Sequence, residues 1–147
     1  MAKTYRLGAG RRAINALFSA TIRAGIGGRS TYLLTTTGRR TGRRRTTPVT
    51  LIENPGERWL VSPYGDVGWV HNVRARPEVQ LSRGHRTESL HAEEVPPEVA
   101  GPILKQYLCA VAVTRPYFDA TVTDPVETFT READRHPVFR LGSEPPD

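Results

Sequence analysis

Cysteine is almost absent from this chain of 147 residues, and long apolar runs are absent altogether. The single cysteine, Cys109, excludes an internal disulfide framework and a cysteine-rich metal site. Its neighbours at 107–111 are mostly apolar, which predicts a buried structural thiol. No apolar stretch approaches the ~20 residues of a membrane span. Arg11, Arg12 and Arg23 also interrupt any signal-peptide core, so we expect a cytoplasmic protein.

Several signatures of catalysis are missing as well. No strand is followed by Gly-x-Gly-x-x-Gly, and no Gly-x-x-x-x-Gly-Lys-Ser/Thr occurs, which argues against a Rossmann domain and excludes a P-loop. No serine or cysteine lies in a nucleophile elbow. Glu93 and Glu94 are adjacent on an expected strand and point to opposite faces, so they cannot form an acid/base couple. Hydrolytic chemistry is therefore disfavoured.

The histidines lack the spacing of metal ligands, and we expect no metal site. Each of them is expected to be exposed or hydrogen-bonded: His71, His85, His91 and His136.

Acidic residues are missing from the first 52 positions, which contain 11 basic residues. The other 95 residues hold 10 basic and 15 acidic side chains, so the net charge of +6 belongs to the N-terminal third. Five arginines fall within the seven positions 39–45. Gly38 and Gly42 flank Arg39 and Arg40, and both glycines can adopt the positive φ of a tight turn. Because the planar guanidinium group pairs well with phosphate oxygens, this turn predicts an anion site.

Apolar periodicity and turn residues predict five to six antiparallel strands joined by hairpins, with inserted helices. The expected strands cover residues 31–37, 44–53, 57–62, 78–83, 85–95 and 138–141. The expected helices cover residues 10–25, 69–76, 96–111 and 124–135. In the last of these, Asp124 is the expected N-cap and Pro125 the first helical residue. The pattern indicates an α+β fold with a barrel-like sheet.

The chain is expected to divide into an N-terminal amphipathic helix segment, residues 1–30, and one domain, residues 31–147. Two interpretations of the helix at 10–25 stay open. It could pack against the domain, or it could lie on an anionic membrane as a peripheral contact.

Aromatic residues lie close in sequence to the arginine turn. Trp59, Tyr64 and Trp69 surround a glycine-punctuated loop at 63–68. An anion site beside aromatic side chains suits a phosphate-bearing aromatic cofactor whose own ring carries out the chemistry. It also suits nucleic acid, with arginines on phosphates and aromatics stacked on bases.

Two motifs favour the cofactor interpretation. The run at 33–42, LLTTTGRRTG, continues to Pro48, and WVHNVRARP follows at 69–77. Together they resemble the deazaflavin (coenzyme F420)-dependent nitroreductase family of actinobacteria, most closely over residues 31–83. The resemblance implies a split β-barrel like that of the flavin reductases and pyridoxamine-phosphate oxidases. It also implies coenzyme F420, an 8-hydroxy-5-deazaflavin, as cofactor, with FMN as the alternative.

The resemblance assigns the phosphate to the arginine turn and its amides, and the deazaflavin ring to the start of the second strand, the following loop and the short helix. The implied cofactor-binding residues are Arg39, Arg40, Thr41, Gly42, Arg45, Pro48, Thr50, Ser62, Pro63, Tyr64, Gly65, Trp69 and Asn72. Tyr117 and Ser62 are the implied proton donors.

The implied activity is hydride transfer from the reduced coenzyme to a small electron-poor acceptor, such as a quinone, an enone or a nitroaromatic compound. Two alternatives stay open: a non-catalytic carrier of the coenzyme, and a basic protein that binds nucleic acid or anionic membranes. If the chain is a coenzyme F420-dependent reductase, we expect no nucleic-acid partner. It is compatible with a monomer or a homodimer.

Overall fold

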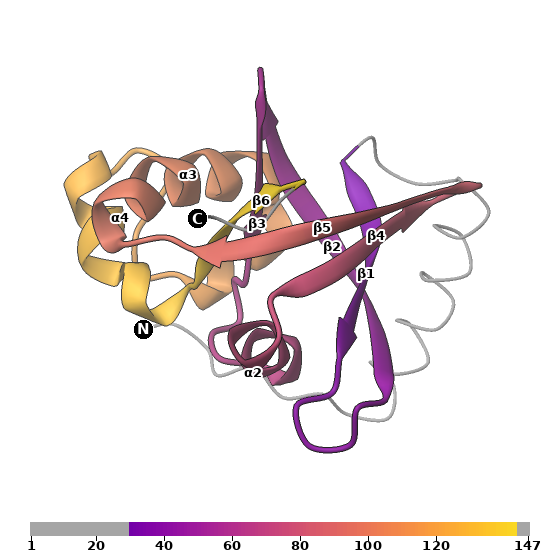
Figure 1. Cartoon of the computed structure of the whole chain (residues 1–147). Coiled ribbons are helices and arrows are strands. Elements are labelled where there is room, and N and C mark those ends of the chain that lie inside the picture. Colours follow the sequence, from indigo (N-terminus) through magenta and orange to yellow (C-terminus); the bar gives the residue numbers. More distant parts are fainter. Residues whose placement is uncertain (1–29, 144–147) are drawn as a thin grey trace.

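The structure is a computed structural model that describes residues 30–143. Six antiparallel strands form a closed barrel in the order β1-β2-β3-β6-β5-β4 (Figure 1). The strands are β1 (Thr31–Thr37), β2 (Arg44–Asn54), β3 (Glu57–Val61), β4 (Glu78–Arg83), β5 (Arg86–Glu94) and β6 (Val138–Gly142). The expected α+β barrel is therefore confirmed, with six strands. The helix expected at 10–25 lies outside the described residues.

Short turns that contain glycine connect β2 to β3 and β4 to β5. Gly56, between β2 and β3, and Gly84, between β4 and β5, have φ of 73° and 59°. Residues other than glycine rarely adopt these φ values, so both turns require glycine. The turns set the register that pairs Ile52 with Trp59 and Leu51 with Leu60.

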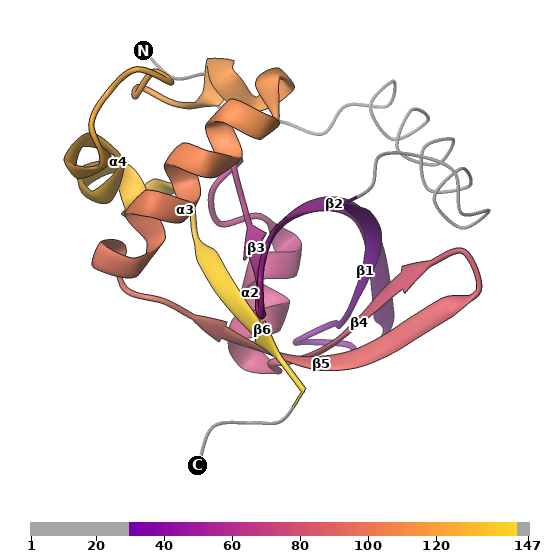
Figure 2. The same ribbon diagram turned by 90° about the horizontal axis from the view of Figure 1, so that it is seen from above.

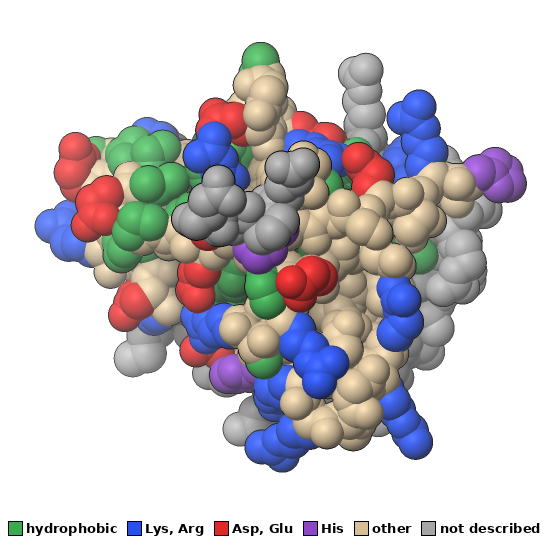
Figure 3. All heavy atoms as spheres, viewed as in Figure 1, with side chains coloured by type: hydrophobic (Ala, Val, Ile, Leu, Met, Phe, Trp, Pro, Cys, Tyr) green, Lys and Arg blue, Asp and Glu red, His purple; other side chains and the backbone are tan. Residues whose placement is uncertain are grey.

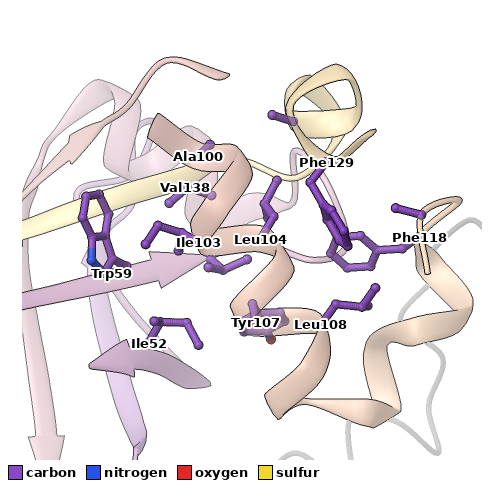
Figure 4. Close-up of a cluster of buried hydrophobic side chains, with 13 residues drawn as sticks. Ile52, Trp59, Ala100, Ile103, Leu104, Tyr107, Leu108, Phe118, Phe129 and Val138 are labelled. Carbon is purple, nitrogen blue, oxygen red and sulfur yellow. The ribbon is translucent and has the colours of Figure 1, made fainter. Parts of the chain in front are cut away.

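Strand alternation divides the core into two layers. Leu51 and Leu60 point into the barrel, whereas their neighbours Ile52 and Trp59 point outward. The outward layer is covered by α3 (Pro97–Ala110) and α4 (Val126–Glu132), which lie on one side of the barrel, away from β1 and β4 (Figure 2). Figure 4 shows Ile103 and Leu104 of α3 between two groups in this layer: strand residues such as Ile52, Trp59 and Val138 on one side, and Phe129 of α4 on the other.

The short helix α2 (Gly68–Ala75) lies at one end of the barrel (Figure 1). Val70 and Val73, buried on its inner face, join the interior barrel cluster. Asn72, which lies between them in the sequence, is also buried. The expected helix at 69–76 is thus present, and its packing brings polar and apolar side chains to the barrel mouth.

Three local expectations were wrong. Asp124 is not the N-cap of α4: Pro125 occupies that position, and Asp124 Oδ2 accepts a hydrogen bond from the Thr121 N–H at 2.8 Å. The 3₁₀ helix η1 (Ala112–Tyr117) follows α3 where no element was expected. Cys109 is exposed, because α3 buries Leu108 and the next residue points about 100° away from that face.

Between residues 30 and 143, no helix combines the length and apolar character needed to cross a bilayer.

Candidate functional site

The arginine turn between β1 and β2 is closed by backbone hydrogen bonds. The Gly38 N–H donates to the Arg43 carbonyl at 2.6 Å, and the Gly42 N–H donates to the Gly38 carbonyl at 2.9 Å. Gly42 has φ of 72°, as expected. Gly38 has no positive φ, and its role is different: a Cβ there would lie 3.0 Å from the Arg43 carbonyl oxygen. The turn is therefore tight because both glycines are present.

The five arginines do not face the same way. Arg44 and Arg45 are adjacent on β2, so their side chains leave the strand on opposite faces. Arg44 extends over the outside of the barrel, where its Nη2 donates to Gln80 Oε1. Arg45 pairs in register with Thr36, a buried residue that is hydrogen-bonded to Asn72. Arg45 consequently faces the barrel mouth.

A pocket of about 970 Å³ opens beside this turn. Arg39, Arg40 and Arg45 line it, whereas Arg43 and Arg44 do not. Within residues 30–143, none of these five side chains forms an ion pair with a carboxylate. Figure 3 shows basic side chains gathered around the turn at the lower edge of the molecule. One end of the pocket therefore carries positive charge that the described part of the chain does not neutralise.

Asn72 of α2 holds the start of the turn in place. Its Oδ1 accepts hydrogen bonds from the backbone N–H of Arg39 at 3.2 Å and from Arg39 Nη1 at 3.1 Å. Its Nδ2 donates to Thr36 Oγ1 at 3.2 Å. Because the Asn72 side chain is buried, these bonds replace the water that it would otherwise need. The turn is thus pre-organised before any ligand binds.

From the arginine end the pocket follows β2 toward α3. Lining residues run from Arg45 to Thr50, five strand steps that correspond to roughly 17 Å. One wall is the loop after β3 together with the first residues of α2; the other is the end of α3 with η1. The lining residues on these walls are Val61, Pro63, Tyr64, Val67, Gly68, Trp69, Asn72, Tyr107, Val111, Val113 and Thr114.

Aromatic side chains form much of the first wall. The Trp69 ring lies 5.8 Å from Phe139 in the barrel core, so Trp69 both anchors α2 and lines the pocket. Tyr64 lines the pocket and meets Tyr117 of η1 edge-on, with ring centroids 4.8 Å apart. Tyr117 does not itself line the pocket. It adjoins the site through Tyr64.

Tyr107 was not expected at the site. It lies on α3, is 4% exposed and lines the pocket. Burial, and to a smaller degree the nearby Tyr64, raises the pKa of Tyr107 well above its usual value. Its hydroxyl therefore stays protonated at neutral pH and can donate a hydrogen bond.

Ten of the thirteen implied cofactor-binding residues line the pocket, and three do not: Gly42, Ser62 and Gly65. Ser62 is fully buried, and its Oγ donates to the Gly65 carbonyl at 2.6 Å. Gly65 has φ of 86°, a value suited to the tight bend of this loop. These residues shape the wall on which Pro63 and Tyr64 lie. The role of Ser62 as a proton donor stays a prediction.

The described residues contain no group of three or more His, Cys, Asp or Glu side chains placed to hold a metal ion.

Comparison with known proteins gives a family match and several structural matches for this chain. The model of the F420H(2)-dependent quinone reductase family matches residues 11–124. The structure of an F420-H2-dependent reductase is 25% identical, with a TM-score of 0.53, and the match covers 77% of this chain and 94% of that one. A structure described as a domain-swapped dimer is 22% identical over 90% and 96% of the two chains, with a TM-score of 0.56.

A further structural match shows the breadth of the fold. A protein from Listeria innocua described as a candidate pyridoxamine 5'-phosphate oxidase is 13% identical, with a TM-score of 0.53. That match covers 79% of this chain and 85% of that one. The expected likeness to the pyridoxamine-phosphate oxidase fold is thereby confirmed.

Proposed function

Because the chain belongs to the F420H(2)-dependent quinone reductase family, and is thus an oxidoreductase that uses coenzyme F420, we propose that its pocket binds this coenzyme and that its acceptor is a quinone. The observation that carries the proposal is the set of three arginines, Arg39, Arg40 and Arg45, at one end of a cavity whose walls are otherwise mainly apolar and aromatic.

The arginine end fits the phosphate of the coenzyme. Each guanidinium group can donate two parallel hydrogen bonds to an anionic oxygen pair. Within residues 30–143 these three side chains have no carboxylate partner, so an incoming phosphate does not have to displace one. Asn72 already fixes Arg39, which lowers the entropy cost of ordering this clamp.

The central part of the pocket fits a flat ring system. Pro48 and Thr50 of β2 form one side, and Tyr64 and Trp69 form another. Of these, Trp69 is held by its contact with Phe139 and Tyr64 by its contact with Tyr117. Rigid walls of this kind hold a planar ligand in one orientation, which is the main contribution that a protein makes to a cofactor's own chemistry.

When bound, the reduced coenzyme supplies a hydride from carbon 5 of its ring. The residues of this chain bind and orient the reactants and exclude water. We assign the Tyr107 hydroxyl as a donor that stabilises the acceptor's carbonyl oxygen, because it lines the pocket and stays protonated. Tyr117, whose ring meets Tyr64 edge-on, adjoins the pocket from behind this wall and is our second candidate to donate the proton that the reduced acceptor takes up.

The α3 and η1 end of the pocket supports a quinone as the acceptor. Val111 and Val113 lie there, and Val113 is 69% exposed at the rim. Among residues 30–143, no lysine or arginine lines this end. An apolar rim beside a neutral hydrogen-bond donor suits a neutral, apolar carbonyl compound better than a charged one.

The test is anaerobic mixing of the protein with reduced F420 and a panel of quinones, enones and nitroaromatic compounds, followed by the absorbance of the oxidised coenzyme. We expect quinones to give the highest kcat/KM of the panel. Oxidation of the coenzyme by none of these compounds, despite tight binding, would indicate a carrier. A clear preference for nitroaromatics would contradict the assigned acceptor.

A further inference from the structure

His136 is buried behind the pocket wall, and both of its ring nitrogens meet acceptors. Nδ1 lies 2.9 Å from the Pro63 carbonyl oxygen, and Nε2 lies 2.6 Å from Glu132 Oε2. The ring stacks on Phe118, with centroids 3.8 Å apart and planes 16° apart. His136 is only 3% exposed. The imidazole is therefore held on two edges and one face.

Sheet register brings His136 to Pro63. β3 and β6 pair antiparallel, with Val61 opposite Val138. The pairing continues one step further, because the Ser62 N–H donates to the Pro137 carbonyl at 2.8 Å. The next step places Pro63 beside His136. The contact thus follows from the barrel itself and does not depend on a flexible loop.

The hydrogen on Nδ1 can be assigned from its partner. A backbone carbonyl only accepts hydrogen bonds, so Nδ1 of His136 must carry the hydrogen that it shares with Pro63. This holds whether the second proton lies on Nε2 or on Glu132. Glu132 accepts further hydrogen bonds: its Oε2, which meets His136, also accepts from the Asp119 N–H at 2.9 Å, and its Oε1 accepts from the Ala120 N–H at 2.8 Å. Arg135 Nη2 lies 3.6 Å from the same Oε2.

One end of this network lies on a wall of the pocket, and the other end lies close in sequence to the opposite wall. Pro63 lines the pocket directly, and Tyr64 follows it. The segment 119–120 begins one residue beyond the end of η1, whose Val113 and Thr114 line the other wall. The Pro63–Tyr64 peptide is trans, since the described residues contain no cis peptide. Its carbonyl points to buried His136, so its N–H points to the other side of the peptide plane.

We propose that His136 is a positioning residue for the coenzyme: its Nδ1–H turns the Pro63 carbonyl away from the pocket and so presents the Tyr64 peptide N–H on the wall. This inference rests on the proposed function, because it gives that N–H a ligand, the polar edge of the deazaflavin ring. Glu132 acts at one remove, by fixing the orientation of the imidazole.

Two substitutions of similar size separate the two ring nitrogens. Asparagine carries its amide nitrogen the same number of bonds from the backbone as Nδ1, and glutamine carries it the same number as Nε2. His136→Asn therefore keeps a donor for Pro63, whereas His136→Gln keeps a donor for Glu132. His85→Gln, at the exposed β4–β5 turn, is the control for the loss of a histidine.

The predicted orders of affinity and stability are opposite. In fluorescence titrations with F420, H136N should bind within about twofold of the wild type, and H136Q about tenfold more weakly, the effect of one lost hydrogen bond. In thermal unfolding, H136Q should be the more stable of the two, because it keeps a partner on the buried Glu132 carboxylate. If affinity instead falls in step with stability, or if both variants bind alike, the positioning role is overturned.

Hydrogen exchange supplies a readout that needs no coenzyme. In the free protein, peptides covering residues 62–67 should exchange faster in H136Q than in H136N or the wild type. Unchanged exchange in H136Q would overturn the inference. A wild-type protein that does not bind F420 at all would instead overturn the proposed function, and this outcome is distinct from binding that is equal in every variant.

Glu132→Gln gives a second test should H136Q not fold. Glutamine can accept from the Ala120 N–H and donate to Nε2 of His136, which leaves the Nδ1–H on Pro63. Its amide nitrogen, in the place of Oε2, loses the hydrogen bond from the Asp119 N–H. We expect coenzyme affinity near that of the wild type together with a lower thermal midpoint. A loss of affinity near tenfold in this variant would contradict the assignment to Nδ1.

Discussion

Replacing Arg45 by alanine should weaken coenzyme binding far more than replacing its neighbour Arg44. The two side chains share one hairpin and one charge, but only Arg45 lines the pocket. A hydrogen bond to a charged group contributes about 1.5–3 kcal/mol, so Arg45→Ala should raise the Kd about 10- to 150-fold. Both side chains are exposed, and neither substitution should change the thermal midpoint appreciably.

Arg44→Ala is the matched control. Its guanidinium lies on the far side of the strand beside Gln80, on the order of 10 Å from a phosphate in the pocket. At that distance in water the lost attraction is about 0.4 kcal/mol before salt screening, which is at most about twofold in Kd. Titration by coenzyme fluorescence at low and physiological salt measures both. Equal losses for the two variants would show that bulk charge, and not contact in the pocket, binds the coenzyme.

Three further predictions concern the acceptor, the helix packing and pH. Tyr107→Phe should leave the Kd of the coenzyme unchanged and lower kcat/KM for quinones about 3- to 10-fold, because one neutral hydrogen bond is lost. Steady-state kinetics measures this change. A higher Kd for the coenzyme would show that the hydroxyl contacts the coenzyme instead. Gly101→Ala should lower the free energy of unfolding by about 1–3 kcal/mol in denaturant titration, because the added Cβ would lie 2.2 Å from Thr130 Oγ1 and close to that residue's backbone; an unchanged midpoint would mean that α3 and α4 separate freely. The hydrogen bond from Arg58 lowers the pKa of Glu88, so this pair stabilises the fold above the unfolded-state pKa and the contribution disappears as the pH falls through the folded-state pKa. Glu88→Gln should therefore flatten the decline of thermal stability between about pH 5 and pH 3. The difference in the free energy of unfolding should be about 0.5 kcal/mol or less, because the pair is exposed. An identical decline in both proteins would refute this.

Local patterns were enough to predict the strands. The turns at Gly56 and Gly84 are short, and each joins two strands that are adjacent in the chain. The arginine turn was predictable for the same reason, because the charges and the glycines that display them lie within seven positions. Elements whose structure depends on neighbours in sequence can be read from the sequence.

Long-range packing was not accessible in this way. Tyr107 reaches the pocket only because α3 packs over the outer face of β2 and β3. His136 meets Pro63 through the β3–β6 register, although 73 positions separate them. The exposure of Cys109 depends on the rotational phase of α3, which apolar composition alone does not give. These features follow from how the elements pack together.

The faces of β2 on which Arg44 and Arg45 lie were only partly predictable from the sequence. Alternation on β2 predicts that Arg44 and Arg45 diverge, but not which of them faces the barrel mouth. The buried partner Thr36 and its bond to Asn72 decide this in the structure. Once that choice is known, the three arginines at the pocket separate from the two outside it.

The most direct test of the central claim is a titration of the wild-type protein with F420 and, in parallel, with FMN. The arginine end would accept the phosphate of either compound, so only the remainder of the pocket can discriminate between them. We predict saturable binding of F420 at one equivalent per chain and a Kd for FMN at least about tenfold higher, a difference of ~1.4 kcal/mol. FMN binding as tight as that of F420, or no binding of F420, would contradict the account.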